Sequence, residues 1–594
     1  MQIWLNYLDQ ILIAAALGLS LNLLLGHAGQ VSVAHAAFGA IGGYTMGYAV
    51  TTYNWSLIWT ILLGVGFSFV VGGLLALVAM RLSVEYLILL TLAFGNVLIG
   101  VISAIPALGG TYGIIQIDNE PHSLHIFGFS LDRPGDWVLP LLVMVIITYA
   151  ICWRMGESAY GRVLKGIRED PVATRSLGKN TFKVQIMVFA ITSALAGLAG
   201  AMNAAWLAVS TPNVFGFNFS LTVVAIVIFG GMANLKGTLV GAFILTALKP
   251  FLERTVKIDP AQAFLIQILV YGVLLVILVM VRPTGLMPEG RTFISFVRRG
   301  NNKGRTEMSA KTAALVEPEF AARSTAGPVD QRARHAKWEQ AEVVLEARGI
   351  SKSFGGIVAA EDLDFVLKKG TITALVGPNG AGKTTVFNLL TGNIVPDRGT
   401  VHLRGKDITG RSLDAAARQG LVRSFQDVRL FQRLSCLDNV LFGVQEQAGE
   451  KLPTLFARPS TVAKSNAAAH EKAMEWLTFV GMQDFANVPA GALSYGQTKL
   501  ISLARVLSTE AEVLLLDEPA SGIDTKWVDN MLDLVLAIAA KGRTVAIVEH
   551  NLRVVTELAD HAYFMELGRI TAEGTVDDLT SSPRLAAAYF GTVA

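Results

Sequence analysis

Nine consecutive residues in the second half of the chain have the composition and spacing of a phosphate-binding loop. The stretch 377–385 reads Gly-Pro-Asn-Gly-Ala-Gly-Lys-Thr-Thr and fits the pattern G-x-x-x-x-G-K-[ST]. It follows an apolar run, 371–377, that predicts a buried strand. In a strand–loop–helix arrangement, backbone N–H groups and the positive end of the helix dipole bind phosphate. The stretch therefore predicts a nucleoside triphosphate site.

Each residue of this loop is a predicted nucleotide contact. We expect Lys383 to reach the β- and γ-phosphates and the Thr384 hydroxyl to bind Mg²⁺. The predicted contacts are Gly377, Pro378, Asn379, Gly380, Ala381, Gly382, Lys383, Thr384 and Thr385.

Two adjacent carboxylates follow a second apolar run, 513–516, which also predicts a buried strand. An acidic pair in this position could simply cap the next helix. Beside a phosphate loop it predicts more: Asp517 is placed to bind Mg²⁺, directly or through water, and Glu518 to polarise the attacking water. The two patterns together predict ATP hydrolysis.

The elements that position this chemistry belong to a chain of two unlike halves. Of its 594 residues, 52% are hydrophobic and only 16% are charged. Long apolar runs fill residues 1–290, whereas the composition from 291 onward is that of a water-soluble domain. The net charge of +3 gives no indication of nucleic-acid binding. The two cysteines, Cys152 and Cys436, lie in different halves, so neither a disulfide nor a cysteine metal site is expected.

The first half has nine apolar runs, and about 20 helical residues cross a bilayer core. They predict a polytopic α-helical membrane domain of roughly 8–10 segments. Two short runs separated by 230–236 are expected to form a pair of short arms. The runs lie at 6–25, 31–50, 56–80, 86–107, 137–153, 184–206, 219–231, 237–252 and 262–281.

The loop 154–183 is rich in Lys and Arg, as is the stretch after 281. Positive charge favours the cytosolic side, so both are predicted to face the cytosol. The N-terminus and the loop 108–136 then face outward. The stretch 161–170 is expected to form a short helix that docks on the ATPase near Gln426, although the basic charge also has a purely topological explanation.

The glycines and the polar residues within the apolar runs each have two possible interpretations. The glycines could allow close helix packing or serve as hinges for alternating access. Polar residues such as Asn22, His35 and Asn203 could bond helix to helix or line a substrate path. No charged residue is expected at mid-depth, which disfavours proton coupling as the energy source.

The domain boundaries follow from these patterns. Residues 1–290 are predicted to form the membrane domain and 343–594 an α/β P-loop ATPase domain. Between them, 291–342 has no apolar periodicity and predicts a flexible linker.

The ATPase half resembles the ATP-binding cassette (ABC) family. Its stretch 493–497, Leu-Ser-Tyr-Gly-Gln, resembles the family signature with Tyr495 as the variant third residue. The resemblance implies that Ser494 and Gly496 contact the γ-phosphate bound by an opposite cassette. It likewise implies a Gln loop, a D-loop, a switch histidine and an adenine-stacking aromatic. These are Gln426 (which would also sense Mg²⁺), Asp524, His550 and Phe354, respectively.

A narrower resemblance covers both halves. The stretches 21–32, 91–95, 108–114, 161–170 and 196–200 resemble permeases of the Liv M type, the branched-chain amino acid permeases. The stretch 423–431 and the C-terminal 588–591 resemble ATP-binding subunits of the Liv G type. The resemblance implies an ATP-driven importer in a bacterial inner membrane, with the ATPase in the cytoplasm.

This resemblance also implies partners. A transporter of this family has two permease domains and two cassettes, and this chain has one of each. A second permease subunit and a second ATPase subunit are favoured over a homodimer, and a periplasmic substrate-binding protein is expected. Urea, amides and other amino acids are alternative substrates. An exporter and a membrane-tethered regulatory ATPase are rival functions.

Overall fold

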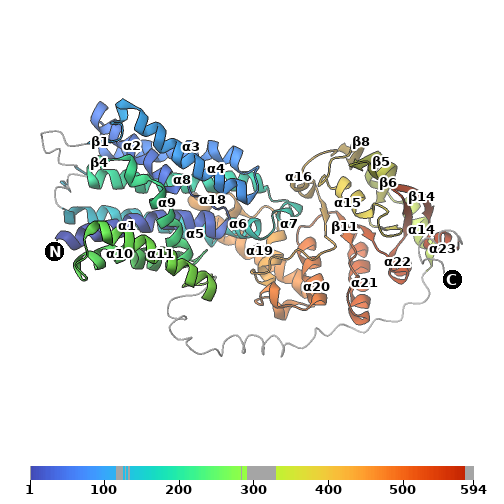
Figure 1. Ribbon diagram of the computed structural model, residues 1–594. Helices are drawn as coiled ribbons and strands as arrows, with labels where there is room; N and C mark the ends of the chain where they lie inside the picture. The colour runs from blue at the N-terminus through green and yellow to red at the C-terminus, as the bar shows by residue number, and fades with distance from the viewer. Residues whose placement is uncertain are drawn as a thin grey trace. The chain divides into compact units, whose positions relative to one another are not determined.

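The computed structural model describes residues 2–115, 125–126, 129–130, 134–282, 284–289 and 330–581. The chain divides into two compact units. One comprises Met1–Arg168 and Thr181–Gly304, and the other comprises Glu169–Asn180 and Arg305–Ala594. The first is a bundle of long helices, whereas the second combines strands with shorter helices (Figure 1). Most of the predicted linker, much of the predicted outer loop 108–136 and the motif 588–591 lie outside the described residues.

Every predicted apolar run of the first unit is helical over most of its length, which confirms the polytopic helical domain. Among the described residues, seven helical segments are long and apolar enough to cross a membrane, and Leu265–Leu278 is a shorter apolar stretch. The helices are α1 (Gln2–Leu21), α2 (His35–Tyr53), α3 (Leu57–Ala79), α4 (Val84–Ala104), α5 (Val138–Gly156), α8 (Thr181–Leu207), α9 (Phe217–Gly230), α10 (Leu235–Arg254) and α11 (Pro260–Val281). At 20 residues, α10 is longer than the predicted short arm.

The helices differ in how much of their surface the unit buries. Of an 18-residue apolar stretch within Trp4–His27, which contains most of α1, 78% of the residues are buried, whereas the corresponding share within Val84–Ala104 is 17%. Large apolar side chains such as Phe67 on α3 and Val97 on α4 point outward. An apolar exterior is suited to a helix that faces lipid. Within the helical unit, α1 is therefore central and α4 is peripheral.

Glycines set the spacing between α2 and α8. A Cβ atom on Gly200 would lie 1.9 Å from the carbonyl oxygen of Gly39, and one on Gly42 would lie 2.0 Å from that of Gly197. No side chain fits at these positions, because the backbones themselves are in contact. The packing interpretation is confirmed for these glycines. Gly66 on α3 differs, since no atom lies within 4 Å of its Cβ position.

The polar side chain of Asn22 joins two parts of the helical unit. It lies in a π-helical turn, η1 (Asn22–His27), that continues α1. Its amide nitrogen donates to the Thr238 hydroxyl at 2.5 Å and to the Asn234 carbonyl oxygen at 3.2 Å, and its oxygen accepts from the Ala233 amide at 2.8 Å. This buried residue therefore bonds helix to helix, as one of the two predicted readings requires.

The basic loop contains two helices, α6 (Ala159–Glu169) and α7 (Pro171–Ser176). The helix predicted at 161–170 is present as α6, but almost all of it belongs to the helical unit. The piece grouped with the ATPase is Glu169–Asn180, which includes α7. Docking of the helix itself stays a prediction. The last two residues of the predicted stretch, Glu169 and Asp170, lie in the unit of the ATPase, where Asp170 pairs with Arg429 at 3.1 Å. Asp170 separates the two helices because its carboxylate accepts from the Val172 and Ala173 amides and caps α7.

The second unit is built on a six-stranded sheet of order β10-β11-β12-β7-β13-β14. The first five strands are parallel, and β14 pairs antiparallel with β13. Every residue of β7, β11 and β12 is buried, which explains their unbroken apolar sequences. The strands are β7 (Ile372–Val376), β10 (Leu421–Arg423), β11 (Val513–Asp517), β12 (Thr544–Val548), β13 (His561–Glu566) and β14 (Arg569–Gly574).

A smaller antiparallel sheet of order β6-β5-β8-β9 accompanies the large one. Its strands are β5 (Val343–Phe354), β6 (Ile357–Lys368), β8 (Arg398–Leu403) and β9 (Lys406–Asp407). The helices of this unit are α15 (Lys383–Leu390), α16 (Leu413–Arg418), α17 (Cys436–Gly443), α18 (Leu452–Ala457), α19 (Pro459–Phe479), α20 (Tyr495–Leu507), α21 (Thr525–Ala540), α22 (Leu552–Leu558) and α23 (Val576–Ser581).

Residues at the end of the predicted linker are helical. They form α14 (Gln331–Gln340), which packs on β13. The Trp338 ring stacks on His561 with centroids 3.7 Å apart, and the Lys368 ammonium lies 4.2 Å from the Trp338 centroid. Asp330 caps the helix by accepting from the Ala333 amide. The absence of apolar periodicity did not predict this helix, because aromatic and cation–π contacts stabilise it instead.

We expect Gly200→Ala to destabilise the helical unit by roughly 1–3 kcal/mol, because α2 and α8 must separate to admit the methyl group. Gly66→Ala, on α3, is the matched control. It adds a methyl group to open space and gains helix propensity. Thermal unfolding of the full-length protein in nanodiscs compares the two variants. Equal melting temperatures would contradict the packing argument.

Lowering the pH should weaken the packing of α14. Burial, with His335 and Lys368 nearby, lowers the pKa of His561 from 6.5 to about 3. The unfolded chain then binds more protons than the folded chain between these values, so stability falls as the pH falls from about 6.5 towards about 3. Glu573 Oε2 lies 3.9 Å from His561 Nε2, and the pKa of His561 is lowered despite this carboxylate. His561→Phe should reduce the pH dependence of the melting temperature, and His470→Phe on exposed α19 should not.

Candidate functional site

The predicted phosphate loop lies between β7 and α15, as its sequence required. Gly377 has φ +148°, and a Cβ there would lie 2.1 Å from the Met565 carbonyl oxygen. Gly382 has φ +103°, and its Cβ would lie 2.2 Å from the Ala359 carbonyl oxygen. Both positions need glycine for conformation and for space. The loop is therefore fitted closely between β13 and β6.

The Lys383 side chain folds back over this loop. Its ammonium donates to the carbonyl oxygens of Gly377 at 2.8 Å and Pro378 at 2.9 Å. Burial lowers the pKa of Lys383, and the carboxylates of Glu518 and Asp517 oppose that shift. The cation is thus already placed over the loop that would surround the phosphates.

Glu518, Gln426 and His550, which the sequence predicted as catalytic, lie together. The Gln426 amide donates to the Glu518 carboxylate at 3.0 Å, and His550 Nδ1 lies 3.8 Å from the other carboxylate oxygen. Glu518 has a left-handed backbone, with φ +48°, and its amide donates to the Val548 carbonyl oxygen. A non-glycine residue in this conformation is strained, as is common at functional sites.

Asp517 lies buried at the end of β11. One carboxylate oxygen pairs with the Arg423 guanidinium at 2.7 Å, and the other, Oδ1, has no hydrogen-bond partner among the described residues. Burial raises the pKa of Asp517, whereas Arg423 lowers it. Mg²⁺ takes oxygen ligands and keeps several waters. The free Oδ1 and the exposed Thr384 at the start of α15 fit that requirement.

Two buried cations were not predicted as site residues. Arg423 pairs with Asp517, and Lys499 of α20 donates to the carbonyl oxygens of Glu518 at 2.9 Å and Gln426 at 3.2 Å. Burial lowers the pKa of Lys499, opposed first by Glu549 and then by Glu518. A lysine five residues after Ser494, directly before the apolar pair Leu500 and Ile501, was the available signal.

The predicted signature residues begin α20. Ser494 forms a capping box with Gln497: the Gln497 amide donates to the Ser494 hydroxyl, and the Ser494 amide donates to the Gln497 side chain. A Cβ on Gly496 would lie 3.0 Å from Trp527. Tyr495 is 50% exposed. Ser494 therefore caps its helix, while the Tyr495 side chain remains open to solvent.

Two further predicted contacts are exposed. Phe354 ends β5 with 45% of its surface exposed and the Lys352 ammonium 5.7 Å from its ring centroid. Asp524 precedes α21 as its N-cap residue, without a side-chain capping bond. Neither residue is inside the cluster around Glu518.

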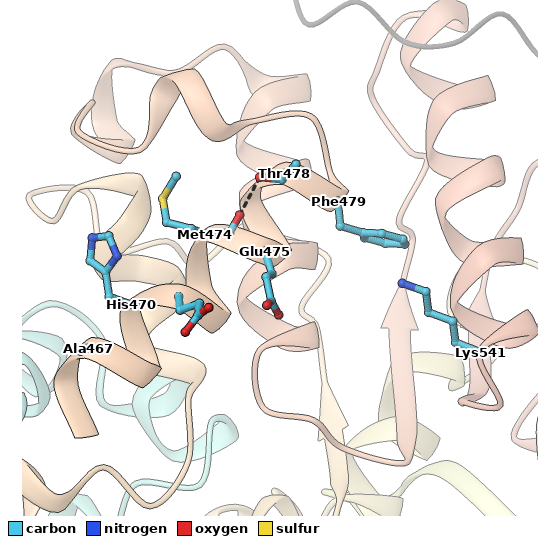
Figure 2. A pocket seen from close by; sticks show the side chains of 8 residues that line it. Ala467, His470, Met474, Glu475, Thr478, Phe479 and Lys541 are labelled. Carbon is cyan, nitrogen blue, oxygen red and sulfur yellow. Dashed lines mark hydrogen bonds between the residues drawn. The ribbon is translucent and has the colours of Figure 1, made fainter. Parts of the chain in front are cut away.

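A surface pocket on α19, lined by residues such as His470, Met474 and Lys541, lies apart from the predicted ATP site. Figure 2 shows the Thr478 hydroxyl bonded to the Met474 carbonyl oxygen and the Lys541 ammonium directed at the Phe479 ring, 4.3 Å from its centroid. None of the predicted nucleotide or metal contacts lines it. The pocket is therefore not the nucleotide site.

Comparisons with known proteins agree on both halves. Residues 3–281 match the family described as "Branched-chain amino acid transport system / permease component", and residues 360–521 match "ABC transporter". The second half is 36% identical over 250 residues to the "High-affinity branched-chain amino acid transport ATP-binding protein BraF" of Pseudomonas aeruginosa, covering 42% of this chain and 98% of that protein. The chain belongs to the ABC transporters of the branched-chain amino acid type.

Other relatives of this ABC transporter chain are similar over the same region. LivG of Escherichia coli strain K12, described as a "High-affinity branched-chain amino acid transport ATP-binding protein", is 33% identical and covers 42% of this chain and 98% of its own length. A crystal structure of a nucleotide-free ATP-binding cassette from an ABC transporter is 33% identical, with a TM-score of 0.37, and covers 42% of this chain and all of its own.

The predicted fusion is confirmed by these matches. One polypeptide combines a permease domain in the membrane with a cytoplasmic cassette that binds and hydrolyses ATP. ABC transporters work with partner subunits, so this chain acts within a larger assembly.

Glu518→Gln should bind ATP as well as the parent protein and lose about 10²–10⁴-fold in phosphate release, because the amide cannot polarise the attacking water. Lys383→Ala is the contrasting variant, which should lose nucleotide affinity. ATP binding and phosphate release are measured separately on the full-length transporter. Parent-like turnover in Glu518→Gln would remove Glu518 from this role.

Proposed function

We propose that this chain is the permease and ATPase component of an importer of branched-chain amino acids in a bacterial inner membrane. The observation that carries the proposal is the occurrence, in one chain, of the permease match over 3–281 and the relationship to BraF and LivG. Those relatives are described as branched-chain amino acid transport proteins. Urea, amides or other amino acids are the alternative substrates.

The domains divide this work. Residues 1–290 form the translocation path, 291–342 the tether and 343–594 the cassette. A second permease and a second cassette complete the transporter, with a homodimer as the alternative, and a periplasmic binding protein delivers the substrate. The described end of the tether forms α14, which packs against β13.

The ATP site acts through the residues already described. The loop 377–385 binds the phosphates, Phe354 stacks on adenine, and Thr384, Gln426 and Asp517 hold Mg²⁺, which supplies charge neutralisation at the phosphates. Glu518 polarises water while His550 and Gln426 orient its carboxylate.

The opposite cassette completes each ATP site. Its Ser494 and Gly496 contact the γ-phosphate, and Asp524 lies near the cassette interface. The solvent exposure of Phe354 and Tyr495 supports this arrangement, because exposed aromatic side chains suit a surface that becomes covered.

Binding energy drives the cycle. Two ATP molecules bring the cassettes together, and the segment Glu169–Asn180 transmits the movement to the permease. Hydrolysis through Glu518 then separates the cassettes and resets the transporter.

Uptake of labelled leucine tests this function. The chain, its companion subunits and the binding protein are reconstituted in proteoliposomes, and ATP should drive leucine to the side of the membrane on which the cassettes lie. Glu518→Gln is the matched control and should give no uptake. Leucine movement away from the cassette side, without need of the binding protein, would indicate an exporter. ATP hydrolysis without movement, and indifferent to the binding protein, would indicate a regulatory ATPase.

A further inference from the structure

The segment Glu169–Asn180 is fixed within the cassette unit by charge at both ends. Asp170 pairs with Arg429 at 3.1 Å, and Lys179 pairs with Glu450 at 2.6 Å. Between them, Gln445 donates to the Leu177 carbonyl oxygen and Arg418 to that of Gly178. The lysine end is buried, whereas Asp170 and Arg429 are partly exposed. An exposed ion pair stabilises little by itself. The Asp170–Arg429 pair is therefore not explained by its contribution to stability alone.

Arg429 also lies over an aromatic ring. Its guanidinium carbon is 5.0 Å from the centroid of Phe425, and the guanidinium carbon of Arg423 is 5.2 Å from the same centroid. Both distances fall within the range of cation–π attraction. One half-buried ring is therefore within cation–π distance of both the arginine that pairs with the segment and the arginine that pairs with Asp517.

Arg423 contacts the nucleotide site on two sides. Besides the ion pair with Asp517, it donates to the Asn388 side chain at 2.5 Å and lies 5.9 Å from the Phe387 ring centroid. Asn388 and Phe387 belong to α15, the helix that begins at Lys383. The Arg423 side chain is 3% exposed, so any displacement of it must be shared by β11 and α15.

Two guanidinium groups close to one ring repel each other. The arrangement is favourable because each cation has its own carboxylate, Asp517 for Arg423 and Asp170 for Arg429. If Asp170 moves away, Arg429 keeps its charge without its partner, and the field at Arg423 changes. The pairing of Arg423 with Asp517 must then change in strength.

We infer that Arg423, Phe425 and Arg429 couple the position of the segment Glu169–Asn180 to the Asp517 carboxylate. We call these three residues the Arg–Phe–Arg link. Arg423 is a positioning residue: it acts through Asp517, whose second oxygen is free for the Mg²⁺–nucleotide complex. The inference deepens the proposed transport function, on which it depends for the role of Asp517.

A double-mutant cycle on metal affinity tests the link. Mn²⁺ binding is measured by electron paramagnetic resonance on the full-length protein in nanodiscs with a non-hydrolysable ATP analogue. Asp170→Asn keeps the cap of α7 but removes the charge, and Arg423→Lys keeps the charge but changes its geometry. Each should alter Mn²⁺ affinity by about fivefold, the scale of a single cation–π contact. If the two residues are coupled, the fold-change in Mn²⁺ affinity of the double variant should differ from the product of the two single fold-changes.

Phe425 variants decide whether the ring carries the coupling. In Phe425→Leu, which preserves apolar volume, the coupling should weaken, because only the direct repulsion between the two guanidinium groups remains. In Phe425→Tyr, which restores an aromatic face, the coupling should return. Lys179→Gln is the matched control, because it breaks the other ion pair of the same segment and should leave Mn²⁺ affinity unchanged.

Several results would overturn the link. These are independent effects in the parent protein, coupling that is undiminished in Phe425→Leu, or an equal shift from Lys179→Gln. The transport assay distinguishes this failure from that of the proposed function. Leucine uptake without coupling defeats only the link, whereas coupling without uptake of any amino acid defeats only the substrate assignment.

Discussion

The residues of the ATP site meet at one edge of a parallel sheet, because β10, β11, β12 and β7 are hydrogen-bonded neighbours that run in the same direction. Each strand supplies site residues at its carboxyl end or just beyond it. Gln426 comes after β10, Asp517 and Glu518 end β11, His550 comes after β12, and the phosphate loop comes after β7. The strand register thus collects groups that are up to 173 residues apart in sequence, as for Gly377 and His550. The phosphate loop after β7 and the carboxylates at the end of β11 are held in place through β12, which pairs with both strands.

Charge balance is the second constraint on this edge. Asp517, Glu518 and Glu549 bring three carboxylates into a largely buried region, and burial raises the pKa of Asp517 and Glu549. Arg423 compensates Asp517 through an ion pair of 2.7 Å, and the Lys499 ammonium donates to the backbone carbonyl oxygens of Glu518 and Gln426. Burial lowers the pKa of both cations. Each group is costly alone and acceptable only with its partner. A triphosphate adds negative charge here, which explains why a further cation, Lys383, lies over the loop.

Sequence reasoning succeeded where the signal is local. The phosphate loop is a contiguous pattern whose glycines are fixed by backbone conformation and space, and the apolar runs are long enough to be helices wherever they pack. It missed Arg423–Asp517 because the two residues are 94 apart and only the strand order brings them together. It predicted one helix over 161–170 and missed the second helix, α7, because the Asp170 cap that begins α7 was not recognised. It missed α14 because the stacking of Trp338 on His561 is a tertiary contact.

The helical unit places its own limit on how transport can work. A hinge needs room for the backbone to change conformation, and Gly42 and Gly200 have none, since a Cβ on either would lie about 2 Å from a facing carbonyl oxygen, 2.0 Å for Gly42 and 1.9 Å for Gly200. Asn22 adds a polar joint between η1 and the start of α10 that would leave buried groups unpaired if it opened. Movement within these contacts is therefore costly. Alternating access is better served by groups of helices that move as rigid bodies, with the change occurring where packing is looser.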